Sequence, residues 1–109
     1  MAKGMGGMMK QAQKLQSKMA KVQEELAGMT VEGDAGGGMI VATANGHQEI
    51  TGIKINREVV DPEDVEMLED LVLAAIQQAR EKAQALAEQK MQKATAGMIP
   101  PGMMQGLGI

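Results

Sequence analysis

The side chains with the clearest chemical potential are lysines, and they are concentrated near the start of the chain. Residues 1–23 contain five lysines and no acidic residue. Four of these, Lys10, Lys14, Lys18 and Lys21, recur every three or four residues. At about 100° per residue they fall within an arc of roughly 80° on a helix. Ammonium groups arranged in this way neutralise phosphates and release counterions, so the stripe predicts binding to a polyanion.

A second positive segment lies near the other end of the chain. Residues 80–109 carry a net charge of +2, residues 24–79 carry −10, and the whole chain carries −3. The net charge therefore conceals a strongly dipolar molecule. The cations of the second segment are Arg80, Lys82, Lys90 and Lys93. Lys90 and Lys93 are equally well explained by the favourable placement of cations near the carboxyl end of a helix.

The plain alternative for the first stripe is a solvated lysine face, which is common on surface helices. Lys10 and Lys14 have no acidic residue three or four positions away that could relieve their mutual repulsion. Lysines in the first turns of a helix also oppose the positive end of its dipole. A sequence shaped for stability alone would place acids there, so the pattern favours a polyanion-binding face.

The composition excludes several other classes of protein. The chain has no aromatic residue and no cysteine, so it cannot stack bases on aromatic rings or build a zinc finger or disulfide framework. His47 and Ser17 are the only histidine and serine, which leaves almost no material for a Ser-His-Asp arrangement. We expect no enzyme activity, no metal, no cofactor and no small-molecule substrate. The twelve methionines suit flexible packing against a partner better than Cu(I) binding.

The lysine stripe requires a helix, and the apolar residues predict one over residues 8–27. They are spaced alternately by four and three residues, at Met8, Ala12, Leu15, Met19, Val22 and Leu26. This heptad-like seam is centred about 120° or more from the lysines. Gly7 and Gly28 lie at the two ends of the predicted helix. Residues 1–7 are expected to form a flexible N-terminus.

The middle of the chain predicts three antiparallel strands, over residues 30–32, 39–44 and 47–56. Asn45-Gly46 predicts a type I′ hairpin turn, which needs positive φ at both central residues. Gly52 interrupts the apolar alternation of the third strand and suggests a β-bulge. The loop at residues 36–38 is three consecutive glycines, which tolerate positive φ.

A second helix is predicted to begin at Asp61-Pro62-Glu63-Asp64, with Asp61 as N-cap and Pro62 in the first helical position. It is expected to continue to about Ala94. Beyond Ala79 its apolar stripe is mostly alanine, which suggests weak burial and a projecting, solvated second half. Residues 97–109 lack periodicity and are expected to form a flexible Gly/Pro/Met tail.

The fold class is therefore α+β, in the order α-β-β-β-α, within a single domain over residues 8–96. Because the first helix ends at the sheet and the second begins there, their free ends point the same way. Antiparallel packing would bring Lys10 and Lys14 to one tip with Lys82, Lys90 and Lys93. Two helices cover at most one face of a three-stranded sheet, so apolar strand residues remain uncovered and a homodimer is expected.

Several segments, taken in order, resemble the YbaB/EbfC family of bacterial nucleoid-associated proteins. They are the amino-terminal stretch KGMGGMMKQAQKLQSKM (residues 3–19), Asn45-Gly46, residues 61–64, residues 67–72 and the closing GMIPPG (residues 97–102). The resemblance implies a homodimer joined largely through its sheets, with helices projecting like tweezers. It also implies DNA binding and DNA reshaping, with roles in nucleoid organisation and gene regulation, and no enzyme activity.

Taken together, these observations predict a dimeric protein that binds double-stranded DNA in the bacterial cytoplasm and nucleoid. No apolar run is long enough to cross a bilayer, and the first residues lack the pattern of a signal peptide. The family's helices map the expected DNA contacts onto Lys10, Lys14, Lys18 and Lys21, and also onto Arg80, Lys82, Lys90 and Lys93. The alternative is an adaptor that docks partner helices through methionine-rich apolar surfaces, with the lysines serving solubility.

Overall fold

A computed structural model describes residues 2–96, and side chains from residue 7 onward. It contains helix α1 (Ala2–Gly28), strands β1 (Thr30–Ala35), β2 (Ile40–Asn45) and β3 (Ile50–Ile55), a short 3₁₀ turn (Arg57–Val59) and helix α2 (Val65–Thr95). The predicted α-β-β-β-α order is confirmed. The expected tail at residues 97–109 lies outside the described residues.

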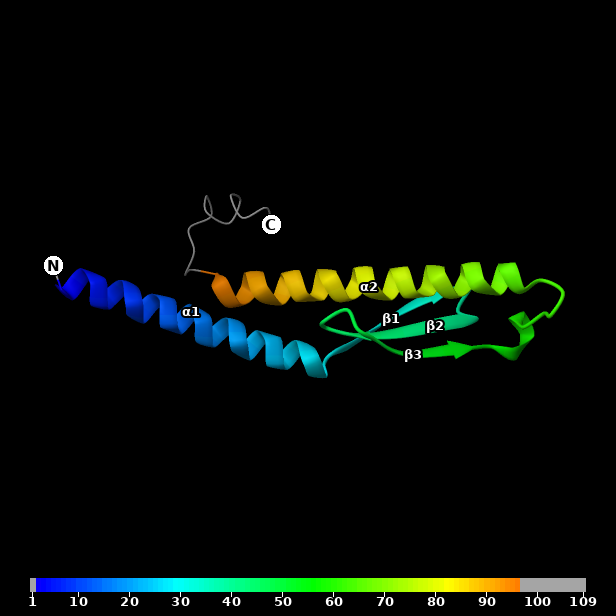
Figure 1. Cartoon of the computed structure of the whole chain (residues 1–109), viewed down its shortest axis with the longest axis horizontal. Helices are drawn as coiled ribbons and strands as arrows, with labels where there is room; N and C mark the ends of the chain where they lie inside the picture. The colour runs from blue at the N-terminus through cyan, green and yellow to red at the C-terminus, as the bar shows by residue number, and fades with distance from the viewer. Residues whose placement is uncertain (1, 97–109) are drawn as a thin grey trace.

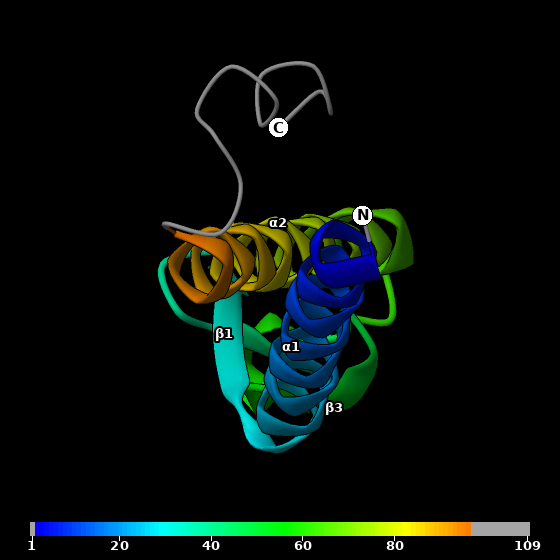
Figure 2. The same cartoon turned by 90° about the vertical axis from the view of Figure 1, so that its left-hand side faces the viewer.

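The three strands form an antiparallel meander in the order β1-β2-β3, and α2 lies along one face of it (Figure 1). The molecule is elongated, measuring 74 × 25 × 16 Å. Helix α1 begins away from the sheet, runs beside the second half of α2 and ends at one end of the sheet (Figure 1). Figure 2 looks along this axis, with α1 in front and the sheet behind it.

The centre of the core is made mostly of alanines, which let helix and sheet approach closely. Ile40, Ala42 and Ala44 of β2 and three alanines of α2 are fully buried; the latter are Ala75, Ala79 and Ala83. A Cβ at Gly33 would overlap the backbone of Ala79, so this glycine allows β1 to lie directly against α2. The expected weak burial beyond Ala79 is therefore wrong at Ala83, because small side chains here are the contact between layers.

The predicted bulge in β3 is confirmed next to Gly52. Thr43 pairs with Gly52 while Ala44 pairs with Ile50, so Thr51 has no partner residue on β2. The extra residue returns Ile50 to the face that also carries Ile53 and Ile55.

The hairpin between β2 and β3 is in the predicted place, but its turn is not type I′. The residue with positive φ is Gln48 (65°), whereas Asn45 and Gly46 have negative φ. The Asn45 carbonyl accepts a hydrogen bond from the Gln48 N–H at 3.1 Å, which matches a three-residue loop ending in a left-handed residue. Gly46 is needed for another reason: a Cβ there would lie 2.5 Å from the Leu26 carbonyl oxygen.

Both predicted helix starts are displaced in the structure. Helix α1 begins at Ala2 rather than near residue 8. The glycines before Met8 lower helix propensity by about 1 kcal/mol each, but they keep their N–H groups and do not break a helix as proline does.

Helix α2 begins at Val65 rather than at Pro62, and its N-cap is Asp64. The Asp64 carboxylate accepts a hydrogen bond from the Met67 N–H at 3.2 Å. Asp61 instead forms a preceding turn, accepting from the Glu63 N–H at 3.0 Å.

Candidate nucleic-acid interface

The carboxyl end of α1 is fixed to the rest of the molecule. These contacts position the preceding turns of the helix, which carry its lysines. The Leu26 carbonyl accepts a hydrogen bond from the Gly46 N–H at 2.9 Å, and Leu26 itself is 1% exposed. The Nε2 of His47 donates to the Gln23 carbonyl at 2.9 Å. Both contacts satisfy carbonyls near the end of the helix, and they come from the turn between β2 and β3.

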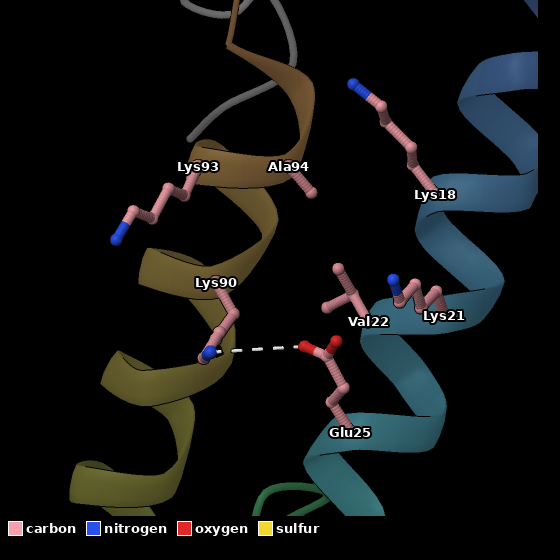
Figure 3. A pocket seen from close by; sticks show the side chains of 7 residues that line it. All are labelled: Lys18, Lys21, Val22, Glu25, Lys90, Lys93 and Ala94. Carbon is pink, nitrogen blue, oxygen red and sulfur yellow. Dashed lines mark ion pairs between the residues drawn. The ribbon is translucent and has the colours of Figure 1, made fainter.

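Helices α1 and α2 then form a groove of about 230 Å³ between them, drawn in Figure 3. Four lysines line it, two from each helix, together with one acidic and two small apolar residues. The lining residues are Lys18, Lys21, Val22 and Glu25 of α1 and Lys90, Lys93 and Ala94 of α2. This gives the groove a formal charge of +3.

Glu25 is the only acid among these lining residues, and it lies across the groove from Lys90. Its Oε2 is 3.9 Å from the Lys90 Nζ, at the outer limit of an ion pair (Figure 3). The Lys90 side chain is 35% exposed and that of Glu25 is 46% exposed. Within residues 7–96, no other ion pair involves the lysines of the groove. Most of the ammonium charge therefore remains available to an anion from solution.

The antiparallel arrangement of the helices is as predicted, but the residues that meet differ. Lys18 and Lys21 line one groove with Lys90 and Lys93, whereas the expectation joined Lys10 and Lys14 to the end of α2. The reason is an axial offset: Lys18 already lies beside Ala94 at the end of α2, and α1 continues past that point (Figures 1 and 3).

The remaining predicted cations are exposed but lie outside the groove. Lys10 and Lys14 are one to two helical turns beyond Lys18, on the part of α1 that α2 does not reach. Arg80 and Lys82 lie on α2 nearer the sheet. The structure thus joins four of the eight predicted cations in one site, and leaves the other four as separate positive charges on the two helices.

Sequence analysis did not single out Glu25 as part of this site. A usable signal was present, because Glu25 directly precedes the seam residue Leu26. Positions that flank an apolar helix seam commonly carry charges that meet across the two helices. Which partner Glu25 would face depended on the offset between α1 and α2, which sequence spacing does not define.

The groove is suited to phosphate groups rather than to bases. Lysine offers a mobile point charge that attracts phosphate without reading a base edge. The absence of aromatic residues from the whole sequence removes base stacking. Within the described residues, no group of three or more histidines or acids could hold a metal ion. None of the described helices is long and apolar enough to span a membrane.

The fold and site define an elongated α+β protein that presents a lysine-lined groove between two helices. A sequence model of the YbaB/EbfC DNA-binding family matches residues 1–98. The chain therefore belongs to this family, as the resemblance in its sequence predicted.

Similar proteins named as nucleoid-associated proteins occur in diverse bacteria. One from Syntrophobacter fumaroxidans is 50% identical over 87% of this chain and 86% of its own length. One from Chloroflexus aurantiacus is 57% identical over 84% of this chain and 91% of its own length. One from Bacillus thuringiensis is 57% identical over 92% of each chain.

Among solved structures, an uncharacterized protein from Helicobacter pylori has a similar fold. Its TM-score is 0.58 at 18% identity, and the match covers 77% of this chain and 93% of that one. At this level of identity the likeness concerns the fold alone. The names of the sequence relatives point to the nucleoid as the place where such proteins act.

Proposed function

We propose that this protein binds double-stranded DNA as a homodimer, without enzyme activity, and reshapes it as part of nucleoid organisation and gene regulation. The observation that carries the proposal is the groove between α1 and α2, which is lined by four lysines and a single carboxylate. Lys10 and Lys14 extend the positive surface along α1, and Arg80 and Lys82 extend it along α2.

Contacts of this kind predict binding that tolerates many sequences. The cations meet phosphates, and phosphate contacts position a protein on a duplex without carrying sequence information. The glutamines of α1, such as Gln13 and Gln16, are exposed and could reach base edges. They are also ordinary helix-forming surface residues, so we assign the binding energy to the lysines.

A homodimer is supported by apolar surface that the single chain leaves open. Helix α2 covers β1 and β2, while Ile53 and Ile55 of β3 remain 40% and 39% exposed on the same face of the sheet. Helix α2 also carries an apolar groove of about 470 Å³, lined by Leu68, Glu69, Val72, Leu73 and Ile76. A second copy covering this surface would join two lysine grooves in one particle and increase their effective concentration on one duplex.

The test removes the charge of two groove lysines while keeping a polar, unbranched side chain at each position. We expect Lys18→Gln with Lys21→Gln to weaken binding to a 30-base-pair duplex. The slope of log affinity against log salt should also become shallower, by about 4 for a dimer that loses four phosphate contacts. Fluorescence anisotropy across a sodium chloride series measures both quantities, and circular dichroism checks the fold.

The control for that test is Lys54→Gln combined with Arg57→Gln. It removes the same charge from exposed residues of β3 and the following turn, away from the groove. We expect it to change the slope little. If the two double variants behave alike, net charge rather than the groove governs binding, and the proposed site is wrong.

A second function, docking of partner proteins, is favoured by one observation. Met8 and Met9 on the outer part of α1 are 72% and 63% exposed. Methionine-rich surfaces adapt to varied apolar partners. Binding of this type would be nearly indifferent to salt, so the same salt series separates the two functions.

A further inference from the structure

The acidic residue in the lysine groove is not explained by the stability of its own helix. Glu25 lies in the last turn of α1, where the negative end of the helix dipole disfavours an acid. Its neighbour Lys21 is four residues earlier, which is the less favourable order for a lysine–glutamate pair on one helix. Local helix energetics therefore give no reason for a carboxylate at this position.

The ion pair with Lys90 does not supply the reason either. The atoms are 3.9 Å apart, and both side chains are more than one-third exposed. Pairs of this kind contribute little to the stability of a protein. The same weakness makes the pair easy to exchange, because either partner can turn to solvent or to another ion without leaving a buried charge behind.

What distinguishes Glu25 is its surroundings. It is a monovalent oxyanion among Lys18, Lys21, Lys90 and Lys93, in an open groove between two helices. A phosphodiester group of DNA is also a monovalent oxyanion, and it would be attracted to the same ammonium groups. We propose that Glu25 occupies the place of a DNA phosphate in the free protein and is displaced from Lys90 when DNA binds.

This proposal rests on the proposed DNA binding and adds a residue that sets its strength. In the free protein the carboxylate gives Lys90 a partner and lowers the charge of the groove from +4 to +3. On binding, Lys90 exchanges the carboxylate for a phosphate, and Glu25 turns to solvent. Glu25 thus lowers affinity for every polyanion and keeps binding reversible.

The test is Glu25→Gln, which keeps the size and polarity of the side chain and removes its charge. We expect duplex affinity to rise about three- to fivefold at moderate salt. The slope of log affinity against log salt should stay nearly the same, because Lys90 contacts a phosphate in both complexes and only the carboxylate that competes with it is lost. Unchanged unfolding in urea would show that the gain arises in binding and not in folding.

The matched control is Glu24→Gln, because Glu24 is the neighbouring residue, is exposed and does not line the groove. It makes the same change in net charge, so it reports the general electrostatic effect alone. We expect a smaller gain in affinity and no change in slope. Equal effects of the two substitutions would overturn the role of Glu25 while leaving the proposed DNA binding intact.

A second arm tests whether Glu25 acts through Lys90. In a Lys90→Gln background there is no ammonium group left for Glu25 to release, so Glu25→Gln should raise affinity less than it does with Lys90 present. An equal gain in both backgrounds contradicts the exchange at Lys90. If the unmodified protein fails to bind duplex DNA at all, the proposed function and this inference both fall.

Discussion

At the scale of the residue, Gly46 shows how a correct local prediction can rest on the wrong cause. The Asn45-Gly46 pair predicts a hairpin, and the hairpin is present between β2 and β3. The positive φ, however, belongs to Gln48. Gly46 is constrained by Leu26, a residue twenty positions earlier, whose carbonyl accepts its N–H. The spacing of residues in the sequence indicates where a turn forms. It does not indicate that two segments far apart in the chain lie in contact.

We therefore predict that Gly46→Ala destabilises the protein although its φ is compatible with alanine. The added Cβ would lie 2.5 Å from the Leu26 carbonyl oxygen and 2.7 Å from its Cβ. Overpacking of this kind costs about 1–3 kcal/mol of unfolding free energy, which a urea titration measures. Gly52→Ala serves as the control, because nothing lies within 4 Å of a Cβ there. Equal stability of the two variants would show that α1 can move away from the turn at no cost.

At the scale of the element, periodicity predicts the kind and order of the helices and strands well, although α1 buries its apolar face only near its carboxyl end, at Val22 and Leu26. The seam of α1 and the bulge beside Gly52 follow directly from the spacing of apolar residues. Helix starts are less well predicted, since several acids near the start of α2 could serve as its cap. The structure selects Asp64, whose carboxylate reaches the Met67 N–H, while Asp61 closes the preceding turn.

This choice leads to a prediction for the start of α2. Asp64→Ala should lower the free energy of unfolding by about 1 kcal/mol, the usual loss when an N-cap is removed. Glu63→Ala removes the same charge from the same exposed segment, but its side chain makes no hydrogen bond among the described residues. It should have a smaller effect in a parallel urea titration. A larger loss from Glu63→Ala would mean that helix-dipole electrostatics outweigh capping at this end.

At the scale of the whole molecule, connectivity alone predicts that α1 and α2 run antiparallel with their cations on one side of the sheet. It does not predict the axial offset, which decides that Lys18 and Lys21, rather than Lys10 and Lys14, share a groove with Lys90 and Lys93. The offset is set by tertiary contacts of Leu26 and Gly46 that have no local sequence signal. The residues of the candidate site were thus largely predictable, whereas their grouping was not.

The proposed dimer depends on the apolar surface of α2. Leu73 is 55% exposed and lines the apolar groove of α2. Leu73→Glu would place a charge in an apolar interface, so we expect the dimer to dissociate in size-exclusion chromatography with light scattering. Gln77→Glu, one helical turn later on the same helix and exposed, adds the same charge outside that groove and should leave the dimer intact.

The same pair of variants connects assembly to DNA binding. A monomer keeps one lysine groove, so it loses the gain in effective concentration that two linked grooves provide on one duplex. We expect Leu73→Glu to weaken duplex affinity by more than tenfold and to make the salt slope about half as steep, since half of the phosphate contacts are lost. Dissociation without any loss of affinity would instead show that each protomer binds DNA independently, and the apolar surface would then serve another purpose than joining the two grooves.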